Sequence, residues 1–185
     1  MKRNKWLLLF MLLSMVIFIY SCHTSDMLVA EFEGSDYGTW ISQGEAFGKT
    51  PVKLDMANPQ RTFPPQRWID LNKSKLGLIK QGMINTSAIN QLGTGILTSS
   101  KIKVQRQYLV FLYSSGEFPD QVGVNILMDG NVVKSLTGTG SAGLEWRYFD
   151  LKEFKGKEIQ IQLTDQIAER NGTLQADYFY LSNTL

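Results

Sequence analysis

The chain has 185 residues, of which 43% are hydrophobic and 19% are charged, with 16 glycines and 5 prolines. This composition is typical of one ordinary globular domain and excludes collagen-like, low-complexity and largely disordered chains. A single cysteine excludes an internal disulfide, and with a single histidine it excludes the usual zinc sites. The formal charge of +2 favours an anionic partner such as nucleic acid only if the basic residues share one surface.

The N-terminal segment has the order of an export signal. A basic stretch precedes the apolar run of residues 6–20, and Ser21 and Cys22 follow the run. The run is shorter than the roughly 20 residues that a membrane-spanning helix needs, so a secretory signal is favoured over a permanent anchor. We therefore predict a signal peptide over residues 1–21.

Residues 19–22 resemble a bacterial lipoprotein box, which implies cleavage before Cys22 and acylation of its thiol. Residues 22–26 then form the lipidated cysteine and a polar tether. This predicts an exported protein, anchored by lipid to the outer membrane or cell surface of a Gram-negative bacterium. The alternatives are a plain secretory signal cut nearby and a buried core thiol at Cys22.

The signal accounts for the positive charge. Without its basic residues the chain holds 16 basic and 17 acidic residues, a net charge of −1; the residues removed are Lys2, Arg3 and Lys5. The remaining lysines alternate with polar, apolar and acidic residues, which is typical of solvated faces. We therefore predict no nucleic-acid partner.

From residue 27 to residue 185 the dominant hydrophobic period is two, with β-branched and aromatic residues between turn residues. This pattern predicts a single antiparallel all-β domain without an amphipathic helix. Nine or ten strands in about 160 residues require two packed sheets, and we predict a jelly-roll sandwich. We expect these strands among the extended stretches at 27–33, 38–48, 75–84, 95–99, 102–106, 108–113, 124–128, 132–136, 144–151, 158–163 and 174–181.

Three segments carry sharper local predictions. Residues 108–113 are almost continuously apolar, which indicates a strand in the middle of a sheet. Asp129 and Gly130 separate two β-branched runs, and this pair favours a tight hairpin because a primed turn needs positive φ. Residues 51–65 are rich in proline and predict a long surface loop.

Several short motifs follow one another in a fixed order along the chain: 32–40, 44–48, 95–99, 108–112, 124–133, 144–146, 154–157, 161–165 and 176–178. Their order resembles the non-catalytic N-terminal β-sandwich of Bacteroidetes levanases and related fructan hydrolases of glycoside hydrolase family 32. The resemblance implies a galactose-binding-like jelly roll. The catalytic propeller of that family has no counterpart in the chain, and Asn58 before Pro59 cannot replace the family's aspartate nucleophile. We therefore predict that the chain is not an enzyme.

Sugars are bound largely by aromatic faces, with planar polar side chains bonding the hydroxyls. Trp68 lies near the proline-rich stretch, which makes it the better candidate for exposure, to a sugar or equally to a partner protein. Trp40 and Trp146 are better explained as core residues, as most aromatic residues of a sandwich are. The candidate carbohydrate-binding residues are Trp68, Arg67, Trp146, Arg147, Trp40 and Tyr113, with Tyr148 as a further possibility.

Carbohydrate-binding jelly rolls often hold a structural calcium ion near the first and last strands, so the resemblance implies a possible Ca²⁺ site. Calcium takes six to eight oxygen ligands. The acidic residues in matching stretches are Glu31, Glu33 and Asp177, with Asp165 as a further possibility. The alternative is that these carboxylates are solvated residues of strand edges and turns. No other cofactor is expected.

Two functions remain open from the sequence. The first is a non-catalytic, surface-anchored module that binds a glycan, with fructan as a possible ligand. The second is an accessory or domain-packing module of a fructan hydrolase, with a hydrolase as its partner protein and no binding activity of its own. The lipid on Cys22 is the predicted contact with the membrane.

Overall fold

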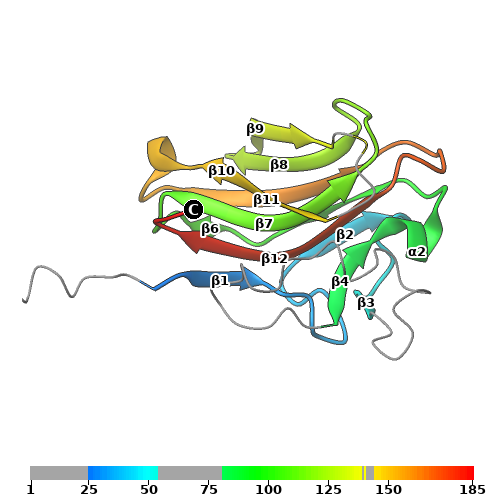
Figure 1. Ribbon diagram of the computed structural model, residues 1–185, viewed down its shortest axis with the longest axis horizontal. Coiled ribbons are helices and arrows are strands. Elements are labelled where there is room, and N and C mark those ends of the chain that lie inside the picture. Colours follow the sequence, from blue (N-terminus) through cyan, green and yellow to red (C-terminus); the bar gives the residue numbers. More distant parts are fainter. Residues whose placement is uncertain (1–24, 54–80, 139, 141–143) are drawn as a thin grey trace, which may run out of the picture.

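The computed structural model describes residues 25–53, 81–138, 140 and 144–185. Two antiparallel β-sheets pack face to face, and a short helix lies at one end (Figure 1). The predicted all-β jelly-roll sandwich is confirmed. Within the described ranges, no helix combines the length and the apolar character needed to cross a membrane.

The two sheets have six strands each. The first has the order β10-β7-β12-β4-β3, with β1 also paired to β12, and the second has the order β2-β5-β11-β8-β9, with β6 paired to β11. The first comprises β1 (Met27–Ala30), β3 (Val52–Lys53), β4 (Gly82–Asn85), β7 (Tyr108–Ser115), β10 (Glu145–Asp150) and β12 (Leu174–Ser182). The second comprises β2 (Ile41–Gly44), β5 (Gly95–Thr98), β6 (Ile102–Lys103), β8 (Val122–Met128), β9 (Asn131–Thr137) and β11 (Glu158–Asp165). The helices are α2 (Thr86–Asn90) and the 3-10 turn η3 (Lys152–Phe154).

Several elements are shorter than the sequence patterns predicted. The described ranges contain twelve strands. The prediction of a loop over 51–65 was wrong at β3, whose two residues are too few to show a period of two, whereas β6 is the two-residue part of the predicted stretch 102–106. Strand β1 ends at Ala30 rather than at residue 33, since Phe32 has a φ of +50° and leaves the β region. The prediction was of no amphipathic helix, and α2 has only five residues, too few to show a helical period.

Two local predictions are confirmed. Strand β7 lies between β10 and β12, in the middle of the first sheet. Asp129 and Gly130 have φ angles of +51° and +81°, as a primed hairpin turn between β8 and β9 requires. The predicted loop over 51–65 and the strand over 75–84 lie largely outside the described residues, and β4 is described from Gly82.

The core lies between the sheets and is organised around aromatic rings. Phe179 of β12 stacks on Phe111 of β7 with a centroid distance of 4.9 Å and an angle of 8° between the ring planes. Phe32 and Trp40, from the chain between β1 and β2, pack against Phe179 at centroid distances of 6.0 and 5.8 Å. One ring on β12 therefore joins the central strand of the sheet to the chain that leads into the opposite sheet.

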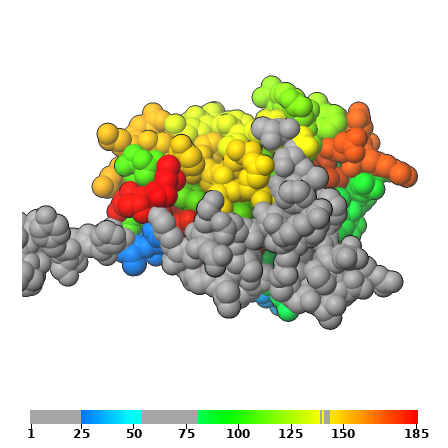
Figure 2. Space-filling model, viewed as in Figure 1, coloured from blue at the N-terminus to red at the C-terminus, as the bar shows by residue number. Residues whose placement is uncertain are grey.

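The two ends of the sandwich carry different parts of the chain. Strand β1 and the C-terminal residues lie together at one end, where Met27 pairs with Leu181 (Figures 1 and 2). The end of β7, the start of β12, the loop 166–173 and α2 lie at the opposite end (Figure 1). The chain therefore enters the sandwich at the end away from these loops.

Replacing Phe179 by Ala removes the ring that the other core aromatic residues share. We expect Phe179→Ala to lower the free energy of unfolding by about 3–5 kcal/mol, the usual cost of deleting a buried aromatic side chain. Ile41→Ala is the control, since Ile41 is 66% exposed on β2, and should change stability by about 0.5 kcal/mol or less. Urea denaturation measures both variants, and equal effects would contradict the central role of the stack.

Candidate functional site

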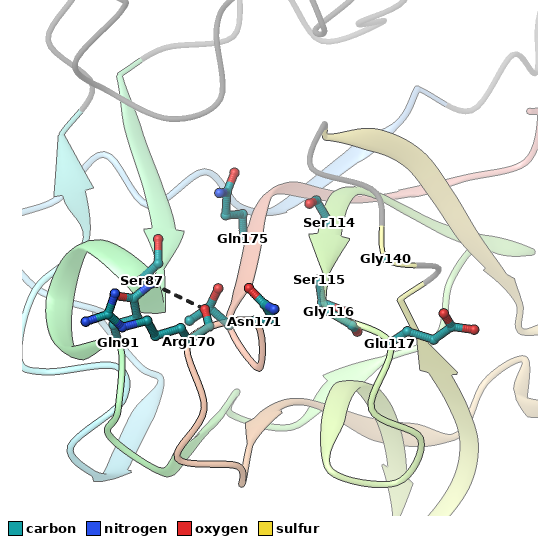
Figure 3. A pocket seen from close by; sticks show the side chains of 11 residues that line it. Ser87, Gln91, Ser114, Ser115, Gly116, Glu117, Gly140, Arg170, Asn171 and Gln175 are labelled. Carbon is teal, nitrogen blue, oxygen red and sulfur yellow. Dashed lines mark hydrogen bonds between the residues drawn. The ribbon is translucent and has the colours of Figure 1, made fainter.

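A polar cleft of about 650 Å³ lies where β7 ends and β12 begins (Figure 3). One wall comes from α2 and the loop before β12, and the other comes from the end of β7 and the residues that follow it. Every lining residue that the structure describes is polar or a glycine. These residues are Ser87, Gln91, Ser114, Ser115, Gly116, Glu117, Gly140, Arg170, Asn171, Thr173 and Gln175.

Hydrogen bonds inside the sandwich hold the walls in place. Thr86 begins α2, and its Oγ1 accepts from the backbone N–H of Leu174 at 3.0 Å, which ties the helix to β12. On the other wall, the hydroxyl of Tyr113 donates to Oγ of Ser115 at 2.8 Å. Both bonds are buried, so water competes little for them. These two hydrogen bonds therefore hold α2 and the end of β7, which form the walls, in position.

Glycine allows the walls to approach each other closely. A Cβ on Gly116 would lie 1.8 Å from the carbonyl oxygen of Asn171, and a Cβ on Gly138 would lie 2.0 Å from Oγ of Ser115. Neither distance is possible between non-bonded atoms, so a side chain at either position would push the loops apart. The backbone N–H of Gly116 donates to the carbonyl of Thr173 at 3.1 Å and closes this contact.

The charges of the described lining residues balance. Arg170 and Glu117 lie on opposite walls and are exposed (Figure 3). The other polar side chains are amides and hydroxyls, which both donate and accept hydrogen bonds. Glu117 is the single carboxylate of the described lining, whereas glycoside hydrolysis normally uses two carboxyl groups. This chemistry suits the binding of a neutral, hydroxyl-rich ligand.

Gln175 is the lining residue that most clearly requires a further partner. It is 6% exposed, and its Oε1 has no hydrogen-bond partner among the described residues. Within the wall formed by α2 and the loop before β12, Nε2 of Gln91 donates to the carbonyl oxygen of Arg170 at 3.3 Å (Figure 3). An unpaired buried amide oxygen costs about 1–3 kcal/mol. A ligand hydroxyl that donates to Gln175 would recover that cost.

Two buried ionisable groups lie beneath the cleft. Burial raises the pKa of Tyr113 to about 12. Burial also raises the pKa of Asp165 to about 6, although hydrogen bonds to Thr86 and to the backbone of Ile167 act in the opposite direction. Neither group is among the described lining residues. Each is connected to the cleft by a hydrogen bond, Tyr113 to Ser115 and Asp165 to Thr86.

The predicted aromatic binding residues do not meet in this cleft. Trp40 and Tyr113 are 9% and 2% exposed, and both belong to the core cluster between the sheets. Their ring faces are covered by core side chains, so the expectation that they stack on a sugar is corrected. Trp68, Arg67 and Cys22 lie outside the described residues.

Trp146 and its neighbours lie on β10, at the edge of the first sheet. The ring of Trp146 is half-buried against Tyr178 and Tyr180, at centroid distances of 6.2 and 6.0 Å. Arg147 pairs with Glu145, with 2.6 Å between Nη2 and Oε2. This aromatic group belongs to a second apolar cluster that lies outside the core between the sheets. None of these residues is among the described lining residues.

The predicted calcium ligands divide into two places. Glu31 and Glu33 lie close enough to Asp177 for their charges to affect its pKa. Asp165 lies on β11 of the other sheet, beside Thr86. Among the described residues, no group of three or more His, Cys, Asp or Glu side chains is arranged to hold a metal ion.

The residues that line the cleft are not among the predicted binding residues. Arg170, Asn171 and Gln175 lie on a loop and at the start of a strand, where no aromatic side chain indicates a surface for stacking on a sugar. Ser114 and Ser115 end an apolar strand. The abrupt change from apolar to polar residues within β7 was the available signal, because a central strand becomes polar where it leaves the core.

No protein-family model matches the chain. The protein ecdE of Aspergillus rugulosus, which is named as a glycosyl hydrolase, is 22% identical over 161 residues, covering 85% of this chain and 21% of that protein. The chain therefore spans about a fifth of the length of this curated relative. The family 32 sandwich thus remains a prediction from the order of the motifs.

Among solved structures, the carbohydrate-binding module TmCBM61 in complex with β-1,4-galactotriose is similar, with a TM-score of 0.52 and 16% identity over 85% of this chain and 98% of that chain. A family 35 carbohydrate-binding module from Clostridium thermocellum has a TM-score of 0.40 and 12% identity over 87% of this chain and 100% of that chain. The likeness to TmCBM61 shows that the chain has the β-sandwich fold of a carbohydrate-binding module.

The raised pKa of Asp165 predicts a pH-dependent stability. A carboxyl group that holds its proton more tightly when folded favours folding below pH 4, and this contribution is lost as the pH rises through about 6. The amide of Asp165→Asn does not ionise, so this variant does not lose this contribution as the pH rises. Its free energy of unfolding at pH 8 should exceed that of wild type by up to about 3 kcal/mol, since one pKa unit is worth about 1.4 kcal/mol.

Urea denaturation at pH 4 and at pH 8 measures this effect for wild type and Asp165→Asn. Asp129→Asn is the matched control, because Asp129 lies in the exposed turn between β8 and β9. An Asp165→Asn protein with the wild-type dependence on pH would contradict the prediction.

Proposed function

We propose that the protein is a non-catalytic glycan-binding module and that the polar cleft is its binding site. The observation that carries this proposal is the buried Oε1 of Gln175, which has no hydrogen-bond partner among the described residues. Sugar hydroxyls both donate and accept hydrogen bonds, and the amide and hydroxyl groups of the cleft match them in kind. The fold that the chain shares with a carbohydrate-binding module adds support.

The proposed ligand is neutral and is held mainly by hydrogen bonds. The balanced charges of Arg170 and Glu117 favour a neutral polysaccharide over an acidic one. Fructan is the first candidate, because the motif order resembles the sandwich domain of fructan hydrolases. A β-1,4-galactan is the second, because the similar module TmCBM61 was solved with β-1,4-galactotriose.

The proposal includes attachment to the outer membrane or cell surface through a lipid on Cys22. The apolar run before this cysteine and its position after Ser21 support this. The described chain begins at the end of the sandwich opposite the loops of the cleft (Figure 1). A lipid ahead of residue 25 would therefore leave the cleft at the end away from the attachment point.

The second candidate function is an accessory module that packs against a hydrolase. The match of this chain to 21% of ecdE, a protein named as a glycosyl hydrolase, favours this candidate. A module of this kind would bind its hydrolase partner and would not bind free polysaccharide. A complex recovered by co-purification with a fructan hydrolase, together with no binding to glycans, would support it over the first.

Gln175→Ala tests the cleft as the binding site. Losing one hydrogen bond costs about 1 kcal/mol, so we expect the dissociation constant for the bound glycan to rise about three- to tenfold. Gln43→Ala is the matched control, because Gln43 is an exposed residue of β2 that is absent from the described lining. Its binding should equal that of wild type.

Affinity electrophoresis and calorimetry with levan, inulin and β-1,4-galactan provide the measurement. Circular dichroism of each variant shows whether the fold is retained. Equal binding by Gln175→Ala and Gln43→Ala would place the ligand outside the cleft, and no binding to any polysaccharide by wild type would overturn the glycan-binding proposal.

Cys22→Ala tests the anchor in a Gram-negative host. Without the thiol there is nothing to acylate, so incorporation of radioactive palmitate should fall to background and the protein should leave the membrane fraction. Cys22→Ser is a second, closely isosteric control and should give the same result. Palmitate incorporation that persists in both variants would refute acylation at Cys22.

A further inference from the structure

The side chain of Lys53 ends among oxygen atoms next to the segment that follows β1. Its Nζ lies 2.5 Å from the carbonyl oxygen of Glu33 and 3.5 Å from that of Phe32. The same nitrogen lies 3.5 Å from Oε2 of the Glu33 carboxylate. An ammonium group has three donors and no acceptor, so these oxygens fit it chemically.

The backbone brings these oxygens to the edge of the first sheet. Phe32 and Tyr178 have φ angles of +50° and +57°, which are uncommon for bulky residues. A Cβ on Gly82 would lie 2.0 Å from the carbonyl oxygen of Phe32, so this segment packs directly on the start of β4. The N–H of Gly82 donates to Oε1 of Glu33 at 2.5 Å, which leaves Oε2 facing Lys53.

Asp177 adds a buried acidic group to this place. It is 3% exposed, and its Oδ1 has no hydrogen-bond partner within the described ranges. Burial raises the pKa of Asp177 well above its ordinary range, and the charges of Glu33 and Glu31 raise it further, whereas the charge of Lys53 lowers it. The ammonium of Lys53 faces the Glu33 carboxylate and the two carbonyl oxygens beside this buried group.

We propose that the ammonium of Lys53 is the resident cation of this acidic cluster and takes the place of the calcium ion that the family resemblance implied. The ammonium contacts two carbonyl oxygens and a carboxylate, which are the ligand types that calcium uses. It needs three acceptors, whereas calcium needs six to eight oxygens. The lysine also joins β3, at the edge of the sheet, to the segment between β1 and β2.

This proposal predicts that the wild-type protein ignores calcium and that removing the ammonium creates a response to it. Without the charge of Lys53, the carbonyl and carboxylate oxygens face one another with no cation between them. A divalent cation that enters from solvent then restores the balance. Lys53→Met removes the charge and keeps an apolar stem, and Lys53→Arg keeps the charge.

Thermal unfolding of the full-length protein, with millimolar calcium chloride or with EDTA, tests the proposal. We expect wild type and Lys53→Arg to melt at the same temperature in both solutions. Lys53→Met should melt lower in EDTA and recover most of the loss in calcium. Lys101→Met is the matched control, because it removes an exposed lysine that pairs with Glu158 at 3.7 Å, and calcium should not change its melting temperature.

Two results would overturn the proposal. One is a wild-type protein that calcium stabilises, since the native cluster would then hold the metal itself. The other is a Lys53→Met protein that calcium does not stabilise. If Lys53→Met does not fold in EDTA, the yield of refolded protein with and without calcium replaces the melting temperature, and no gain in yield with calcium overturns the proposal.

Discussion

The stacking of Phe179 on Phe111 is the interaction on which the rest of the structure depends. It joins β12 to β7, the two central strands of the first sheet, and the aromatic residues between β1 and β2 pack on the same ring. The pairing of β12 with β7 shifts register between Asp177 and Tyr180. Tyr178 has positive φ within this irregularity, a local distortion that well-packed surroundings can maintain. With the stack in place, β12 reaches the cleft at one end and pairs with β1 at the other.

The cleft combines a hydrogen-bonded frame with one buried acceptor, Oε1 of Gln175, that has no partner in the described part of the chain. Glycines at 116 and 138 allow backbone and side-chain atoms to meet at distances that no other residue permits. The bonds of Thr86 and Tyr113 fix the walls from inside the sandwich. Binding groups held in advance lose little entropy when a ligand arrives, so even a modest set of hydrogen bonds can give useful affinity.

Much of the fold was predictable because burial imposes a period of two on a strand that packs on one face. The apolar run in β7 indicated a central strand, and the Asp129 and Gly130 pair indicated the hairpin, since both depend on neighbouring residues alone. The two-residue strand β3 and the five-residue helix α2 carry too little pattern to be found. The site was less predictable, because aromatic residues serve the core as well as they serve sugars, and the structure assigns Trp40 and Tyr113 to the core.

The sequence by itself determined the antiparallel sandwich, the central strand and the hairpin, because each follows from hydrophobic pattern or turn chemistry along a continuous segment. Only the tertiary structure decided which polar residues line one cleft, since Gln91, Glu117 and Gln175 come from separate elements. It also decided that Lys53 reaches the carbonyl oxygens of Phe32 and Glu33. Contacts between distant residues depend on strand pairing and register, which no local pattern records.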